Sequence, residues 1–267
     1  MQLSPVSIQY PIDARRLAQY AAQSQALVTL PISALHTPDL APLRSEVLRA
    51  NLHLSRSGLA LYTFGNASAI DRASGLVVIK PSGVPYEEMR EEDLVVTDID
   101  GRIVEGELRP SSDLPTHLVL YRAFPSIGGV VHTHSHYATV WAQAGREIPC
   151  MGTTHADYFR GPVPITDTLE EGEITSEYEA NTGHAIVRRF RDLDHEEMPA
   201  TLVAGHASFC WGPTVSDAVH TAELLETVAH MAYDTASINP SASPISNHLL
   251  DKHFLRKHGA QAYYGQR

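Results

Sequence analysis

The stretch Gly129-Val130-Val131-His132-Thr133-His134 places two histidines two residues apart at the end of an apolar, β-branched run. Such a run is typical of a buried strand, and residues i and i+2 of a strand point to the same face. Both imidazoles are therefore expected to point toward one place. A histidine pair of this kind supplies two nitrogen ligands to zinc or a similar divalent ion, although paired histidines also occur on ordinary protein surfaces.

A third histidine completes a candidate metal site. His206 closes a second apolar run, Thr201-Leu202-Val203, and a strand is expected from Thr201 to His206. Three neutral ligands that leave one position open are the arrangement of a catalytic rather than a structural zinc. The sequence therefore predicts a metal site formed by His132, His134 and His206.

Other histidine and acidic clusters compete with this set. His136 continues the alternating series, but it falls at the expected strand-to-helix junction. Three residues spaced along one helix face favour a solvated or subunit-facing surface: Glu223, Glu226 and His230. Three more recur every five residues, and such a spacing is not expected to keep them on a single helix face: His248, His253 and His258.

Turns rich in glycine, hydroxyl and amide groups suggest an anion site. These turns are residues 63–68, which include Asn66, then Lys80-Pro81-Ser82-Gly83, and Ser111-Ser112. Exposed main-chain N–H groups at such turns, and the start of a helix near Ser112, favour negative charge, while Lys80 supplies a positive one. Each segment alone is an ordinary turn. Together they predict a phosphate site.

Two further polar segments remain open. The loop Thr153-Thr154-His155-Ala156-Asp157-Tyr158 carries groups suited to acid–base chemistry, but from sequence alone a hydrogen-bonded turn is the simpler interpretation. The C-terminal Tyr263-Tyr264 pair indicates that the tail docks on this chain or on a neighbouring subunit.

Composition excludes several classes of protein. With 267 residues and a net charge of −11, the chain has no basic stripe for nucleic acid. No apolar run approaches the roughly 20 residues that span a membrane, and Met1–Tyr20 does not resemble a signal peptide. Cys150 and Cys210 are isolated, as expected for buried thiols in a reducing cytoplasm, so a cytoplasmic location is expected.

Hydrophobic periodicity and turn residues predict the elements. Residues 1–41 are interpreted as an N-terminal extension with a short helix over Asp13–Ala26, and 42–267 as one domain. Strands are expected over 59–64, 76–80, 94–98, 103–105, 130–134 and 201–206. Helices are expected over 43–54, from about 113, and over 137–144, 174–190, 216–236 and 246–258. The pattern predicts an α/β single domain with a central, largely antiparallel sheet flanked by helices.

Long motifs carry a resemblance to a known family. They are TFGNASAIDRASGLVVIKPSGVPY, GELRPSSDLPTHLVLYRAFPSIGGVVHTHSHYATVWAQAG, GTTHADYF and LLDKHFLRKHGAQAYYGQ. From about Leu43 to Gln266 the chain resembles the L-ribulose-5-phosphate 4-epimerases of the class II aldolase family. The resemblance implies a metal-dependent isomerase of carbohydrate metabolism, in arabinose or ascorbate breakdown. It also implies a cyclic homotetramer with active sites between subunits, acting on a small sugar phosphate.

The resemblance also implies roles for individual residues. One Zn²⁺ per subunit, or another divalent metal, is expected on His132, His134 and His206, with Asp113 beside it. The implied acid/base pair is Asp157 and Tyr264, reaching in from a neighbouring subunit, with His253 and Thr153 nearby. The substrate phosphate is expected on five positions: Asn66, Lys80, Gly83, Ser111 and Ser112.

The chain departs from the family pattern in two places. Ala207 follows the third metal histidine where the family commonly has glycine, and the extension before residue 41 has no counterpart. A sugar-phosphate aldolase of the fuculose 1-phosphate type is the alternative, although such aldolases tend to have glutamate at the position of Asp113. A non-catalytic, adducin-like structural domain is a remote alternative because all three candidate ligands are present.

Overall fold

The computed structural model describes residues 39–265. The expected helix over Asp13–Ala26 and nearly all of the expected N-terminal extension lie outside the described residues. Leu40–Arg267 forms one compact unit. No helix among the described residues is long and apolar enough to cross a membrane.

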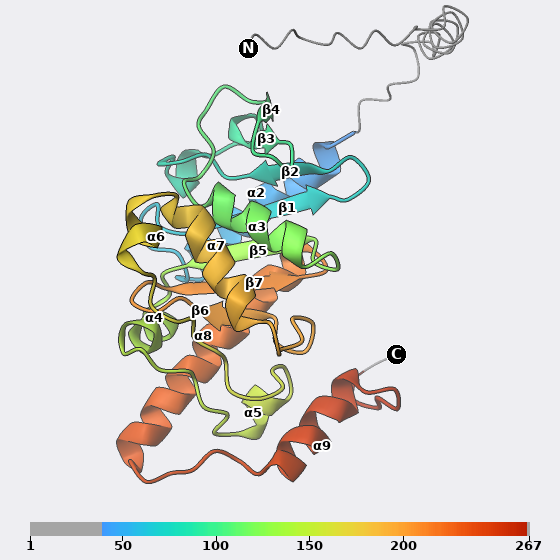
Figure 1. The fold of residues 1–267 in the computed structure, drawn as a ribbon. Coiled ribbons are helices and arrows are strands. Elements are labelled where there is room, and N and C mark those ends of the chain that lie inside the picture. The colour runs from blue at the N-terminus through green and yellow to red at the C-terminus, as the bar shows by residue number, and fades with distance from the viewer. Residues whose placement is uncertain (1–38, 266–267) are drawn as a thin grey trace, which may run out of the picture. The chain divides into compact units, whose positions relative to one another are not determined.

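A seven-stranded sheet forms the centre of this unit (Figure 1). Its order is β4-β3-β2-β1-β5-β7-β6, and every neighbouring pair is antiparallel. The strands are β1 (Asn66–Asp71), β2 (Leu76–Ile79), β3 (Val95–Thr97), β4 (Ile103–Glu105), β5 (Gly129–Thr133), β6 (Ala200–Leu202) and β7 (Ser208–Gly212). The central β5 lies between β1 and β7, so the strand that carries His132 is held on both sides.

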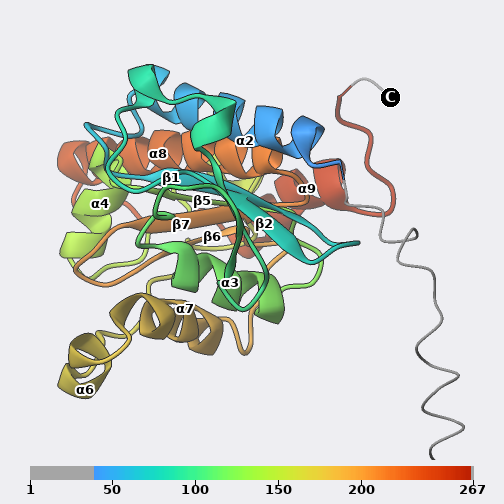
Figure 2. The same ribbon diagram turned by 90° about the horizontal axis from the view of Figure 1, so that it is seen from above.

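Helices cover both faces of the sheet. Figure 2 shows α2 (Ala41–Arg56) and α8 (Val215–Ile238) on one face, and α3 (Leu114–Ala123) and α7 (Tyr178–Arg189) on the other. The remaining helices are α4 (His136–Gln143), α5 (Thr153–Ala156), α6 (Glu171–Thr175) and α9 (Asn247–His258), with short 3-10 turns η2 (Tyr86–Glu88) and η3 (Glu91–Asp93). The predicted single domain with a largely antiparallel sheet is confirmed.

Small residues let α8 approach the sheet closely. A Cβ atom on Gly129 would lie 2.3 Å from Cα of Val215 and 2.5 Å from its nitrogen, so no larger residue fits without a backbone shift. Helix α2, which covers the same face of the sheet, buries Val47 and Leu54.

One predicted strand is wrong. Residues 59–64 form turns rather than a strand, and the first strand begins at Asn66. Tyr62 has a φ of +55° and Gly65 a φ of +108°, and neither value fits a continuous strand. The apolar side chains of the turn explain the error: Leu61, Tyr62 and Phe64 are exposed instead of alternating between core and solvent.

Three more elements differ from the expectation. The helix expected over 174–190 is interrupted, because α6 ends at Thr175 and α7 begins at Tyr178. The strand expected over 201–206 ends at Leu202, so His206 lies in the turn that leads to β7. Strand β7 itself was not predicted. It is fully buried, so its sequence Ser-Phe-Cys-Trp-Gly has no polar alternation to reveal it.

Candidate active site

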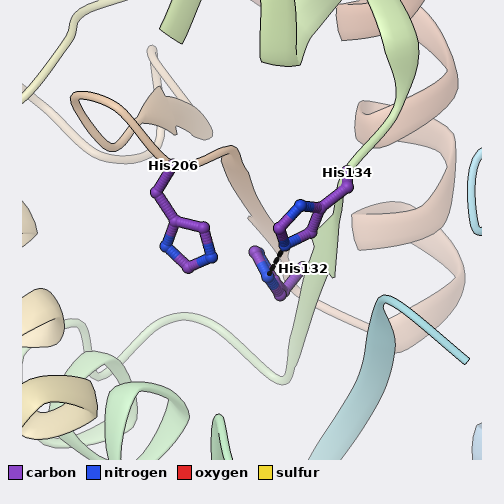
Figure 3. Close-up of side chains that lie close together, drawn as sticks. All are labelled: His132, His134 and His206. Atoms are coloured by element: carbon purple, nitrogen blue, oxygen red, sulfur yellow. Dashed lines mark hydrogen bonds between the residues drawn. The ribbon is translucent and has the colours of Figure 1, made fainter. Parts of the chain in front are cut away.

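The three predicted metal histidines converge in space. One ring nitrogen of each lies within 4.8 Å of the others. Figure 3 shows His132 and His134 at the end of β5, with a ring nitrogen of His206 turned toward them from the opposite turn. The Nε2 atoms of His132 and His134 are 3.1 Å apart. His136, the competing residue, lies at the start of α4 with an exposed side chain outside this group.

The surroundings keep these rings suited to binding a metal. Burial lowers the pKa of His134, and burial together with His132 and His134 lowers the pKa of His206 to about 4. His132 Nδ1 donates a hydrogen bond to the main-chain oxygen of Ser208 at 2.9 Å, which leaves Nε2 with a free lone pair. Neutral rings with accepting nitrogens are the form in which histidine binds zinc.

The distance between the ring nitrogens of His132 and His134 also fits a single bound ion. Two nitrogens bound to one tetrahedral zinc at about 2.0–2.1 Å would be roughly 3.3 Å apart. The 3.1 Å between the Nε2 atoms of His132 and His134 is close to that value. Nδ1 of His206 is buried and has no hydrogen-bond partner among the described residues, and an imidazole nitrogen left in that way fits a donor set that binds a divalent cation.

Asp113 lies beside this group. Its carboxylate accepts a hydrogen bond from the Asn66 amide at 2.6 Å. Burial alone would raise the pKa of Asp113, but the nearby His132 and His117 and the Asn66 hydrogen bond outweigh burial and lower it. The carboxylate is therefore ionised and adds negative charge next to the candidate cation site.

A cavity of about 380 Å³ joins the histidines to the predicted anion site. It is lined by His132, His134, His206 and Asp113, and by all five predicted phosphate residues: Asn66, Lys80, Gly83, Ser111 and Ser112. Asn66 faces His132 across the β1–β5 pair and donates to the hydroxyl of Ser111 at 3.0 Å. The sheet register thus places the two predicted sets in one cavity.

Lys80 is buried almost completely, with 1% of its surface exposed. Its Nζ donates to the Pro81 carbonyl at 3.1 Å and lies 4.9 Å from the centre of the Tyr86 ring. Burial lowers the pKa of Lys80 to about 8. No ion pair joins Lys80 to a carboxylate among residues 39–265, so an anion that enters the cavity meets an unneutralised ammonium group.

Sequence reasoning missed some residues that line this cavity. Tyr178 and Glu179 line it from the start of α7, whereas Phe64, which also lines it, belongs to the predicted 63–68 segment. The Tyr178 ring centre lies 6.2 Å from that of His206, and the Phe64 ring centre 6.0 Å from that of His134. The break between α6 and α7 would have indicated Tyr178 and Glu179. The sequence predicted one continuous helix over 174–190, which gave no reason to place residues from its middle in a site.

The predicted acid/base residues form a separate cluster. The Asp157 carboxylate accepts two hydrogen bonds from Arg256, at 3.0 and 2.8 Å, and contacts Nδ1 of His253 at 3.0 Å. The Arg256 guanidinium lies 4.5 Å from the centre of the Tyr264 ring. Burial opposes ionisation of Asp157, but the hydrogen bonds from Arg256 and His253 outweigh burial and lower its pKa.

This cluster joins α5 and α9. Thr153 lies one turn before Asp157, and its carbonyl accepts the Asp157 N–H at 2.9 Å. His258 Nε2 donates to the main-chain carbonyl of Asp157 at 2.9 Å, so His253 and His258 contact different atoms of the same residue. Within residues 39–265, none of Thr153, Asp157, His253 and Tyr264 lines the cavity that holds the three histidines.

The sequence is similar to that of known proteins. The family described as Class II Aldolase and Adducin N-terminal domain matches residues 45–233. An L-ribulose-5-phosphate 4-epimerase UlaF of Salmonella paratyphi B is 54% identical over 225 residues, which cover 84% of this chain and 99% of that protein. A protein of the same name from Salmonella typhi has the same identity and coverage.

Solved structures agree on the fold. An L-fuculose 1-phosphate aldolase has a TM-score of 0.68 and 28% identity, and covers 80% of this chain and 94% of its own. An L-fuculose-1-phosphate aldolase from Thermus thermophilus has a TM-score of 0.58 at 22% identity, over 77% of this chain and 100% of its own, and supports the fold alone. With the family match over residues 45–233, these similarities show that the chain belongs to the class II aldolase and adducin N-terminal domain family.

Proposed function

We propose that this protein is a metal-dependent L-ribulose-5-phosphate 4-epimerase, which interconverts L-ribulose 5-phosphate and D-xylulose 5-phosphate. The observation that carries the proposal is one cavity lined both by three converging histidines and by the candidate anion-binding residues around Lys80. The curated relatives at 54% identity carry this activity in their names.

The reaction inverts C4 of a ketopentose phosphate. Its C4 hydrogen has no adjacent carbonyl and is not acidic, so inversion by direct deprotonation is implausible. Breaking C3–C4 is the alternative: a base removes the proton of the C4 hydroxyl, C4 becomes an aldehyde, and the C3–C4 electron pair moves toward the C2 carbonyl. Rotation of the aldehyde followed by bond re-formation gives the other configuration, and an acid then protonates the new C4 oxygen.

The cavity residues suit the binding part of this reaction. A divalent cation on His132, His134 and His206 would supply positive charge where negative charge develops, on the C2 and C3 oxygens. Lys80, with Asn66 and the serine hydroxyls, would hold the phosphate so that the aldehyde fragment turns without escaping. Zinc is our proposal for the ion, one per subunit.

The second cluster suits the proton transfers. The lowered pKa of Asp157 keeps it ionised, which favours the base role, while the Tyr264 phenol donates a proton on the other face. His253 contacts the same carboxylate and offers a route for returning the proton. Because the cluster does not line the cavity of its own chain, we propose a cyclic tetramer in which each site combines two subunits.

Residues 42–267 would form the catalytic domain, and a cytoplasmic location fits a metabolic enzyme with free buried thiols at Cys150 and Cys210.

A coupled assay tests the proposal against the alternative. Conversion of L-ribulose 5-phosphate to D-xylulose 5-phosphate, lost with a chelator and restored by a divalent metal, is the expected result. A sugar-phosphate aldolase is the second candidate because a fuculose phosphate aldolase shares the fold at 28% identity. Cleavage of fuculose 1-phosphate faster than epimerisation would make it the better assignment.

A further inference from the structure

We propose that Glu226 of α8 is a positioning residue that holds His134 in its metal-binding place. This inference rests on the proposed metal site. Its basis is a contact between the sheet-covering helix α8 and the first turn of α4, the helix that begins two residues after His134.

Glu226 takes the place of the local helix cap. Its Oε1 accepts the main-chain N–H of Tyr137 at 2.8 Å, and its Oε2 accepts that of Ala138 at 3.0 Å. Ser135 occupies the N-cap position, but among the described residues its side chain makes no capping hydrogen bond. A carboxylate that accepts two first-turn N–H groups satisfies donors that the helix leaves unpaired and complements the positive end of its dipole.

This arrangement corrects the expectation for the helix face of Glu223, Glu226 and His230. Glu226 is partly buried and bonded to α4 instead of facing solvent. His230 stacks on Tyr137 with ring centres 3.7 Å apart, and Glu223 pairs with His53 at 2.6 Å. Two of the three residues therefore contact the start of α4.

The position of the His134 ring depends on the main chain around it more than the position of the His132 ring does. His132 lies inside β5, and its ring is anchored by the Ser208 carbonyl at 2.9 Å. His134 lies in a two-residue link between the end of β5 and the start of α4. Among the hydrogen bonds of residues 39–265, its ring makes only the contact with His132. The position of the His134 ring is therefore set by the two ends of its link, one held by the sheet and the other by Glu226.

The decisive variant is Glu226→Gln. Its amide can accept only one of the two N–H groups, because its NH2 would face the other, and the negative charge is lost. We expect the dissociation constant of zinc, measured by chelator competition on the metal-free protein, to rise about 10- to 100-fold, as is usual when a residue supporting a metal ligand is lost. Amide hydrogen exchange at Tyr137 and Ala138 should accelerate.

Two controls separate positioning from a general loss of stability. Glu223→Gln removes a carboxylate one turn earlier on the same helix, where it pairs with His53 and not with α4. His230→Ala removes the ring that stacks on Tyr137 but leaves both N–H bonds. Both are expected to bind zinc as the unchanged protein does, even where their melting temperatures fall. Should Glu226→Gln fail to fold, Glu226→Asp keeps the charge but shortens the reach.

The outcomes are distinct. Zinc binding by both Glu226 variants at wild-type affinity, with wild-type protein binding zinc normally, would overturn this inference alone. Equal weakening by His230→Ala would also overturn it, because the effect would then be general loosening of α4. A wild-type protein that binds no divalent metal would overturn the proposed metal site, and this inference with it.

Discussion

The Nδ1 atom of His132 donates to the main-chain oxygen of Ser208, at 2.9 Å, across the β5–β7 pair. Because the acceptor is a carbonyl, the tautomer is determined and Nε2 of His132 is left to accept. The Phe209 ring, next along β7, stacks on the same imidazole with centres 4.3 Å apart. A strand that sequence reasoning did not predict therefore holds the first candidate metal ligand in place.

Metal content tests the histidine set directly. The purified protein is expected to contain about one zinc or similar ion per chain, and His134→Asn and His206→Asn to lose most of it, because two ligands hold zinc far less well than three. His136→Asn is the matched control, since that exposed ring lies outside the group. Metal analysis by mass spectrometry gives the answer, and full occupancy in both ligand variants would contradict the site.

Replacing the buried ammonium tests the anion site. Lys80→Met is expected to raise KM for L-ribulose 5-phosphate by at least about tenfold while kcat falls much less, because a phosphate contact stabilises ground and transition states equally. Steady-state kinetics separates the two parameters. Lys252→Met, which changes a lysine on α9, should leave KM unchanged. A loss confined to kcat would place Lys80 in the chemistry instead.

The pH dependence of KM follows from the lowered pKa of Lys80. Its folded-state pKa of about 8 lies below the usual 10.5, so Lys80 is charged below pH 8 and loses its charge as pH rises through that value. The phosphate loses its second charge below about pH 6. KM should therefore be lowest between these limits and rise on the alkaline side. The alkaline rise should disappear in Lys80→Met, and its persistence there would assign it to another group.

The sequence predicted those parts of the site that depend on local pattern. Alternation along the expected strand 130–134 put His132 and His134 on one side, and glycine and hydroxyl residues at turns indicated residues that line the same cavity. What it missed depends on tertiary contacts. Glu226 reaches α4 from α8, which begins about 80 residues later in the chain. The hydrophobic periodicity of the sequence gives no information about such a contact.

Fully buried or irregular segments were the other source of error. Strand β7 has no polar face, and the turn at Tyr62 carries apolar residues that resemble a strand. The separation of Asp157 from the histidines could not be predicted from spacing either. In the structure, α9 packs on α5 and brings Arg256 to the Asp157 carboxylate.

Packing of α8 on the sheet leads to a stability prediction. Gly129→Ala would place a Cβ atom 2.3 Å from Cα of Val215, and because backbone must move, the free energy of unfolding should fall by about 1–3 kcal/mol or more. Gly172→Ala on α6 meets nothing within 4 Å and should be neutral or slightly stabilising. Urea unfolding measures both. Equal stability of the two variants would mean that α8 does not approach β5 this closely.

Subunit mixing tests whether the two clusters meet between chains. A Tyr264→Phe chain and a His134→Asn chain should each be nearly inactive alone. If Tyr264 serves the histidines of a neighbour, a random, equal mixture in a cyclic tetramer gives about one site in four with both halves intact, so activity should approach a quarter of wild type. Mass spectrometry of the mixture confirms that subunits have exchanged. No recovery after exchange would mean that each site is built within one chain.

A second mixture uses the contact between Asp157 and the tail. Asp157, Arg256 and Tyr264 lie together in one chain, so Asp157 and Tyr264 should enter the same neighbouring site together. Mixing Asp157→Asn chains with Tyr264→Phe chains should therefore restore nothing, because every site would lack one of the two groups. Recovery near a quarter in this mixture would instead show that the carboxylate and the phenol reach each site from different subunits. The two mixtures together distinguish a shared cluster from two separately contributed residues.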